Sequence, residues 1–405
     1  MPVASETPFT LAVSDDALAL LHKKLAMTRL PDELDDAGWD YGVPLAHVRR
    51  MVERWQIGFD WRAAEREINE LPMFTRPIEV DGFGALGLHY VHQRSTRPDA
   101  IPLLFVHGWP GTFLEVEKIL PLLTEPENAN APAFHVVAPS IPGYGFSEAP
   151  HKPGFHHSQN AEICHKLMLA LGYDQYVAQG GDLGRRVTQI LATTYAPAHV
   201  KAWHTNMPAP QGPPRFLSDP LGYLSYITTP FTSSEKAGFA RAKWFKETGR
   251  GYYMMHATKP QTLAYSLADS PAGLLAWIYE KMVLWSDDYA WDDDEVLKWI
   301  SVYWFSRAGP AASTRIYFER QVADPLYRAA PPPVAPLGIS HFPKELYPLP
   351  SSWCRTIGNV IHEGKHARGG HFAAHESPEA LVGDLRSMFG RGGPAYGIVM
   401  SANGY

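Results

Sequence analysis

The chain has 405 residues, of which 45% are hydrophobic, and a formal net charge of −6 at pH 7. This length and composition fit a globular protein with one large α/β domain and an insertion, or with two domains. The mild charge, without a basic stripe, argues against binding of nucleic acid. We find no signal peptide and no run of about 18 uncharged apolar residues, and Cys164 and Cys354 provide no disulfide framework. We therefore expect a cytoplasmic enzyme without a membrane segment.

Residues 1–77 are predicted to form a helical N-terminal segment that packs as a layer on a larger body. Ser14, followed by two aspartates, is a typical cap for a periodic segment at 17–27. Further helices are expected at 45–55 and 61–71.

From residue 78 strands and helices alternate. Strands are predicted at 85–92, 101–106, 134–137 and 176–178, and helices at 158–171 and 185–195. The run 101–106 is continuously apolar, as expected of a strand that is buried on both faces. This alternation predicts an α/β core with a mostly parallel sheet over residues 78–207.

The pattern changes again at 208–214, which is rich in proline and glycine and is predicted to be a linker. Residues 208–312 are mainly helical and rich in tryptophan, and we interpret them as an inserted helical cap. Strands at 337–339 and 359–362 and a helix at 377–389 then complete the core over 313–405.

A turn typical of a hydrolase nucleophile follows the strand at 176–178. Residues 179–184 read Gln-Gly-Gly-Asp-Leu-Gly, which has the small-x-nucleophile-x-small spacing of a nucleophile elbow, with Asp182 at the nucleophile position. Small neighbours are needed because the nucleophile adopts a strained conformation. A carboxylate at this position attacks a saturated carbon and forms an alkyl ester. The alternative is a glycine-rich turn in which Asp182 only caps the following helix.

A second turn, His-Gly-Trp-Pro-Gly at 107–111, directly follows the apolar strand at 101–106. In this place a loop offers a backbone N–H to an oxyanion hole, so Trp109 and Leu183 are the predicted amide donors. Loss of one such donor typically raises the barrier by ~3–4 kcal/mol. The alternative is a glycine turn with a buried tryptophan.

The base and its acid partner are expected late in the chain, in the order nucleophile, acid, histidine. His371 lies in Gly-Gly-His-Phe-Ala at 369–373, after a strand and before the last helix, with His366 and His375 as the alternatives. Glu345 follows the strand at 337–339 and would fix the imidazole tautomer. The competing carboxylates are Asp324 and Glu363.

A proton donor is also required for the leaving oxygen, and a tyrosine hydroxyl suits this task. Tyr252 in the cap and Tyr317 just beyond it are the candidates. With nineteen tyrosines in the chain, each of them is equally compatible with simple aromatic packing.

Together these motifs resemble the epoxide hydrolases of the α/β-hydrolase superfamily, on the branch of the microsomal and fungal enzymes. The matching segments are 39–42, 55 and 59–62 in an N-terminal meander, 107–110, 180–182 and 369–372 in the active site, and 258–260 and 269–277 in the cap. The resemblance spans nearly the whole chain. It implies an α/β-hydrolase fold with a helical cap insertion and an N-terminal meander.

The resemblance also implies roles for single residues. Asp182 would be the nucleophile, Glu345 the acid and His371 the base, while Tyr252, rather than its neighbour Tyr253, would hold the epoxide oxygen together with Tyr317. This branch uses no metal or organic cofactor. Because the chain begins near the meander and lacks the membrane anchor of the microsomal enzymes, we expect a soluble bacterial member. Leu183 departs from a frequent aromatic at its position, which leaves the pocket shape open.

The predicted reaction is hydrolysis of an epoxide to a vicinal diol through an ester on Asp182. The aromatic cap favours a bulky apolar or aryl epoxide, such as an intermediate of secondary metabolism, and a homodimer is the default if the chain associates. A haloalkane dehalogenase also uses an aspartyl ester, but Leu183 removes one usual halide-binding tryptophan. A non-catalytic binding protein of this fold is the other alternative, although such proteins often lose a triad residue.

Overall fold

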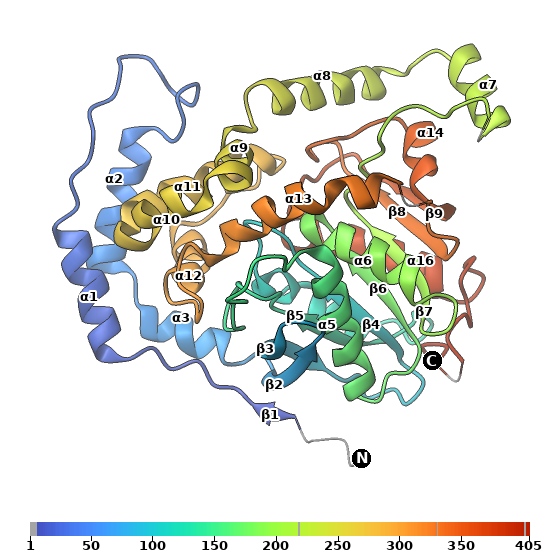
Figure 1. Cartoon of the computed structure of the whole chain (residues 1–405), viewed down its shortest axis with the longest axis horizontal. Helices are drawn as coiled ribbons and strands as arrows, with labels where there is room; N and C mark the ends of the chain where they lie inside the picture. Colours follow the sequence, from blue (N-terminus) through green and yellow to red (C-terminus); the bar gives the residue numbers. More distant parts are fainter. Residues whose placement is uncertain (1–5, 218, 330, 401) are drawn as a thin grey trace.

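The computed structural model describes residues 6–217, 219–329, 331–400 and 402–405, which are built around one mixed sheet (Figure 1). Its strand order is β1-β2-β3-β5-β4-β6-β7-β8-β9. Pairing is antiparallel from β1 to β5 and parallel from β5 onward. The strands are β1 (Thr7–Pro8), β2 (Met73–Val80), β3 (Gly84–Gln93), β4 (Ile101–Val106), β5 (Phe134–Pro139), β6 (Tyr176–Gly180), β7 (Val200–Thr205), β8 (Pro336–His341) and β9 (Asn359–Lys365).

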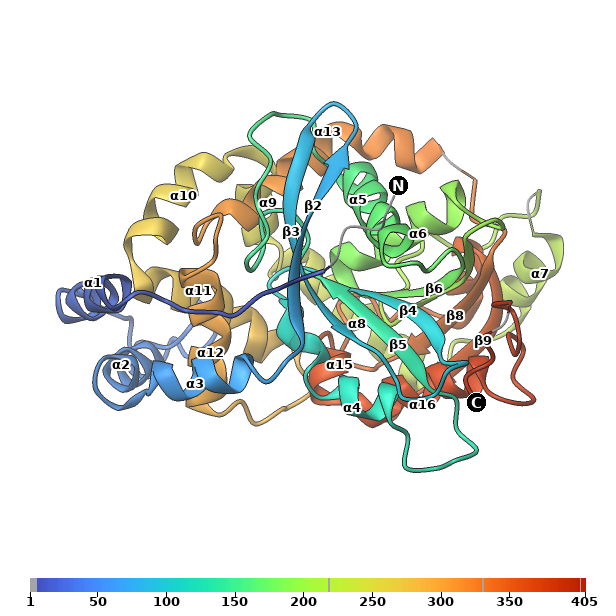
Figure 2. The same ribbon diagram turned by 90° about the horizontal axis from the view of Figure 1, so that it is seen from below.

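Helices cover both faces of the sheet (Figure 2). One face carries α5 (His157–Ala170) and α6 (Asp182–Thr194), and the other carries α4 (Ile119–Thr124) and α16 (Pro378–Phe389). The central strands are buried on both sides: every residue of β4 and β6 is buried. The apolar run at 101–106 therefore predicted its strand correctly, and the mostly parallel sheet between two layers of helices is the architecture expected from the sequence.

The cap consists of α7 (Pro220–Thr228), α8 (Ser233–Glu247), α9 (Gly251–Thr258), α10 (Pro260–Asp269), α11 (Pro271–Trp285) and α12 (Asp293–Trp304). It lies between β7 and β8 in the chain. The next helix, α13 (Arg315–Ala329), packs against α9 and returns the chain to the core (Figure 1). None of the helices that the structure describes combines the length and apolar character needed to cross a bilayer.

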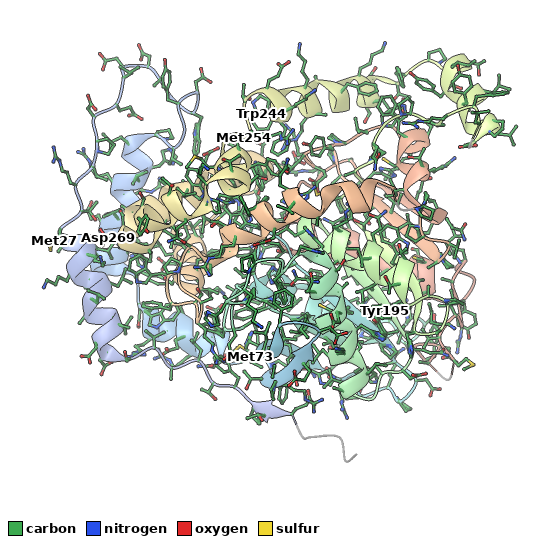
Figure 3. The ribbon with its side chains drawn as sticks, viewed as in Figure 1. Met27, Met73, Tyr195, Trp244, Met254 and Asp269 are labelled. Carbon is green, nitrogen blue, oxygen red and sulfur yellow. The ribbon has the colours of Figure 1, made fainter. Side chains whose placement is uncertain are left out.

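The helices α1 (Asp15–Ala26) and α2 (Leu45–Glu53) of the N-terminal segment pack against the cap helix α11, whereas its strand β1 pairs with β2 in the sheet. The segment also contains a π-helical turn (Arg54–Gly58) and α3 (Trp61–Ile68). Ion pairs join it to the cap, among them Lys24 Nζ to Asp269 Oδ1 at 2.6 Å, and Asp269 marks this junction in Figure 3. The helix expected at 45–55 ends earlier, at Glu53, because the backbone changes to π-helical hydrogen bonding from Arg54 onward.

Two strands and one long helix differ from what the sequence analysis predicted. β2 begins at Met73, so the expected boundary at 77/78 falls inside a strand. β7 was not predicted, because Lys201 and the bulky Trp203 and His204 hide its apolar pattern. α13 was not predicted either; it begins directly after a short 3-10 turn at Ala312–Thr314.

Candidate active site

The turn between β6 and α6 holds Asp182 in a left-handed conformation, with φ at 46°. Such a value is rare for a residue with a Cβ and is a source of strain at functional sites. Gly181 is the N-cap of α6, and Asp182 is the first residue of this helix. The backbone at Asp182 therefore has the strained conformation that the predicted elbow requires.

Glycines allow the close approach that this turn requires. A Cβ on Gly184 would overlap with the carbonyl of Val106, and a Cβ on Gly180 would collide with the backbone of Gly184. A Cβ on Gly108 would overlap with the Asp182 carboxylate itself. The glycines of both motifs thus bring the His-Gly-Trp-Pro-Gly loop against the elbow.

Two backbone amides bind the Asp182 carboxylate. The Trp109 N–H donates to Asp182 Oδ1 at 2.8 Å, and the Leu183 amide is the second donor. Burial raises the pKa of Asp182, while the charge of His371 and the hydrogen bonds from the Trp109 and Leu183 amides oppose this rise. The amides of Trp109 and Leu183 thus both lie at the Asp182 carboxylate.

His371 lies between two carboxylates. Its Nδ1 is 2.7 Å from Glu345 Oε1, and its Nε2 is 3.6 Å from Asp182 Oδ2. Glu345 follows β8 and His371 follows β9, so two neighbouring parallel strands end beside the elbow. Burial lowers the pKa of His371, but the charge and hydrogen bond of Glu345, followed by the charge of Asp182, outweigh it and raise this pKa to about 9.

The histidines and the carboxylate Glu363, which the sequence left as alternatives for the base and the acid, have other partners. His366 Nε2 lies 2.7 Å from Asp384, and His375 Nε2 lies 2.6 Å from Glu295. Glu363 pairs with His341 and Arg355. The side chain of Asp324 lies outside the described part of the chain. Among the described side chains, Glu345 is therefore the carboxylate in contact with His371 Nδ1.

Tyr252 on α9 and Tyr317 on α13 meet edge to face, and both rings contact Trp109. Their ring centroids are 5.9 Å apart, and the Tyr252 ring stacks on Trp109 at 4.8 Å. Both side chains are buried, and Tyr317 Oη has no hydrogen-bond partner among the described residues. Burial, with the charge of Asp182 contributing, raises both pKa values well above 10, so both hydroxyls remain donors. The neighbouring Tyr253 instead donates to Gln321 Oε1 at 3.1 Å.

Three further side chains border this group and were not assigned to it from the sequence. The Trp285 ring lies 5.0 Å from the His371 ring and 5.2 Å from the Tyr252 ring. Lys281 is buried, with its Nζ 5.4 Å from the Tyr252 ring centroid. The third side chain is Glu115. Burial raises its pKa to about 8, although the charge of His371 acts to lower it. Lys281 interrupts an apolar run, and this was the one signal in the sequence for these residues.

No group of three or more His, Cys, Asp or Glu side chains suited to hold a metal ion occurs within the described ranges. A buried carboxylate on a strained turn, two amides, an imidazole–carboxylate pair and two phenols define a hydrolase site of the α/β-hydrolase fold.

Comparison with known proteins extends this assignment. Residues 6–116 match the family model described as epoxide hydrolase N terminus, and residues 101–266 match that of the alpha/beta hydrolase fold. The sequence is 39% identical to a provisionally named epoxide hydrolase of Stigmatella aurantiaca, over 95% of this chain and 84% of that protein. It is 33% identical to epoxide hydrolase 1 of Sus scrofa, over 96% of this chain and 90% of that protein.

A solved structure gives the same result. The epoxide hydrolase of Aspergillus niger is 35% identical and superposes with a TM-score of 0.82, over 95% of each chain. The chain therefore belongs to the epoxide hydrolases, in the microsomal and fungal type of this family. It is an enzyme that hydrolyses the epoxide of a small molecule.

Proposed function

We propose that the enzyme converts an epoxide to a vicinal diol in two steps, through a covalent ester on Asp182. The observation that carries this proposal is the environment of the Asp182 carboxylate. One oxygen is bound by the Trp109 amide, and the other lies 3.6 Å from His371 Nε2. In this proposal the first oxygen occupies the oxyanion hole, and the second attacks the epoxide.

In the first step Asp182 Oδ2 attacks an epoxide carbon, and the carbon–oxygen bond of the ring breaks. The leaving oxygen takes a proton from the pair Tyr252 and Tyr317, whose raised pKa values keep them protonated beforehand. Tyr317 Oη, buried and without a partner in the described structure, supports a role as donor to a ligand oxygen.

In the second step His371 Nε2 removes a proton from water, and the resulting hydroxide attacks Cγ of Asp182. Negative charge develops on Oδ1, where the amides of Trp109 and Leu183 stabilise it. The ester bond then breaks, and the leaving alkoxide takes the second proton of the attacking water from the carboxyl group formed on Asp182. The diol leaves, Asp182 is a carboxylate again, and the proton held by His371 returns through solvent to the tyrosine pair. Glu345 stabilises the imidazolium for as long as His371 holds this proton.

The two steps are coupled through charge. In the resting enzyme the Asp182 carboxylate contributes to the raised pKa of His371. Formation of the ester removes this negative charge, so the pKa of His371 falls at the moment when a neutral base is needed.

The site is lined by aromatic rings, which favours a bulky apolar or aryl epoxide. The rings of Trp109 and Tyr252 stack on each other, and each lies within contact distance of both Trp285 and Tyr317. The tyrosine pair also favours an epoxide oxygen over a halide as the leaving group, since phenols can transfer a proton to an alkoxide.

The test uses styrene oxide and two variants. Asp182→Ala is expected to lose all turnover, because the ester cannot form. His371→Gln is expected to form the ester but not to hydrolyse it, so intact mass spectrometry shows protein plus one substrate. Normal turnover in Asp182→Ala, or an unmodified mass in His371→Gln under conditions in which the unmodified enzyme turns over, contradicts the mechanism.

A further inference from the structure

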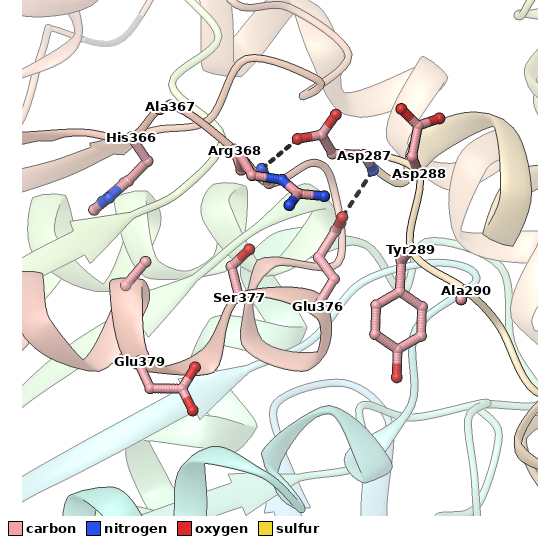
Figure 4. A pocket seen from close by; sticks show the side chains of 12 residues that line it. Asp287, Asp288, Tyr289, Ala290, His366, Ala367, Arg368, Glu376, Ser377 and Glu379 are labelled. Atoms are coloured by element: carbon pink, nitrogen blue, oxygen red, sulfur yellow. Dashed lines mark hydrogen bonds between the residues drawn. The ribbon is translucent and has the colours of Figure 1, made fainter.

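The loop that carries His371, residues 369–372, is held by the cap on the side away from Asp182. A cavity of about 610 Å³ opens there, lined by Asp287 from the cap and by Arg368, Glu376 and Glu379 from the core (Figure 4). Asp182, Glu345 and His371 do not contribute to its lining. The cavity therefore exposes the rear of the catalytic loop rather than the substrate site.

Two hydrogen bonds join this loop directly to the cap, and two more connect the loop with the cap through Glu376. The Gly369 N–H donates to Asp287 Oδ2 at 2.8 Å, and the Asp287 N–H donates to Glu376 Oε2 at 2.8 Å. Both bonds are drawn in Figure 4. The Phe372 N–H donates to Glu376 Oε1 at 3.0 Å, and the His371 N–H donates to the carbonyl of Trp285 at 2.9 Å.

The fit between the loop and the cap is close. A Cβ on Gly370 would lie 2.5 Å from the Trp285 carbonyl oxygen and 3.1 Å from the Asp287 amide nitrogen. Gly369 has φ at 111°, which favours glycine at this position. Two glycines thus let the loop lie directly on the cap backbone. The amides at positions 369, 371 and 372 donate to the Asp287 side chain, the Trp285 carbonyl and the Glu376 side chain, respectively.

Both carboxylate oxygens of Glu376 accept hydrogen bonds from these amides, whereas in the described structure Asp287 accepts through Oδ2. Burial raises the pKa of Glu376 to about 7, while the Asp287 and Phe372 amides and the charge of His371 oppose this rise. A glutamine in place of Glu376 offers one acceptor only and turns an NH₂ group towards the other N–H. An asparagine in place of Asp287 still offers the single acceptor that Gly369 needs.

We propose that Asp287 and Glu376 are positioning residues for the hydrolytic step, which fix the loop of His371 from the cap. The inference rests on the two-step function proposed above. In that function a water molecule must fit between His371 Nε2 and Cγ of Asp182. Displacement of such a group by about 1 Å can slow a reaction by about 100-fold. Asp182 and the tyrosine pair lie on other elements, so formation of the ester does not depend on this loop.

The experiment follows a single turnover of styrene oxide by rapid quench and intact mass spectrometry. It compares the unmodified enzyme with Glu376→Gln, Asp287→Ala and Asp287→Asn. Glu379→Gln is the matched control, since Glu379 lines the same cavity but is exposed and makes no hydrogen bond or ion pair with any residue that the structure describes. Thermal unfolding of each variant is measured in parallel.

We expect Glu376→Gln and Asp287→Ala to form the ester at a rate within about threefold of the unmodified enzyme and to hydrolyse it about 10- to 100-fold more slowly. Asp287→Asn is expected to restore most of the rate that Asp287→Ala loses, and Glu379→Gln to hydrolyse the ester normally. Hydrolysis at the normal rate in Glu376→Gln overturns the proposal, as does an equal loss of both steps in parallel with stability.

The result also separates this inference from the proposed function. If His371→Gln accumulates the ester but the loop variants hydrolyse it normally, the positioning role is wrong and the mechanism stands. If no ester forms in any variant while the unmodified enzyme still releases diol, the mechanism is wrong and the positioning role falls with it.

Discussion

Replacement of Glu345 by glutamine separates the charge of this residue from its shape. Glu345 is 1% exposed, and its Oε1 accepts hydrogen bonds from the Leu346 amide and from His371 Nδ1. A glutamine of the same size keeps an oxygen for these donors but loses the negative charge. The variant thus reports how far the charge supports the imidazolium that forms during hydrolysis.

The structure sets the magnitude. The pKa of His371 is about 9 against an ordinary value of 6.5, although burial alone would lower it. This difference corresponds to roughly 3 kcal/mol of imidazolium stabilisation, and Glu345 is its largest source. If most of it is lost in Glu345→Gln, the barrier to hydrolysis rises by roughly 3 kcal/mol and the rate falls by about 100-fold.

The assay is the same single turnover, in which ester formation and ester decay are measured separately. We expect the ester to form at nearly the normal rate and to decay about 100-fold more slowly, so that it accumulates in the steady state. Glu363→Gln is the control, because Glu363 pairs with His341 and Arg355 instead of His371. Decay at the normal rate in Glu345→Gln would refute the reasoning.

Two further predictions concern the tyrosine pair and the dependence on pH. Tyr252→Phe combined with Tyr317→Phe removes both proton donors and is expected to slow ester formation by at least about 100-fold; normal burst kinetics in the double variant would exclude this role. Because its folded pKa is raised, His371 contributes stability that is fully present below about pH 6.5 and is lost as pH rises through about 9. Urea unfolding at several pH values should show this loss in the unmodified enzyme, and His371→Gln should lack it; identical pH profiles would contradict the raised pKa.

The sequence by itself determined the parts of the site that depend on short-range geometry. The elbow at Asp182 and the loop at Trp109 were predicted because steric constraints of a tight turn act over a few residues and demand glycines at fixed spacing. The continuous apolar run at 101–106 likewise showed its burial directly, since a strand covered on both faces is mostly apolar.

Tertiary structure alone decided which distant residues meet. Tyr252 and Tyr317 were two of nineteen tyrosines until the packing of α9 on α13 turned their rings towards each other. Glu345 was one of three carboxylates until β8 and β9 ended side by side next to the elbow. The contact of Asp287 with Glu376 joins residues 89 positions apart and leaves no local pattern. Such pairings depend on the packing of whole elements, so no periodicity or motif within a single segment reports them.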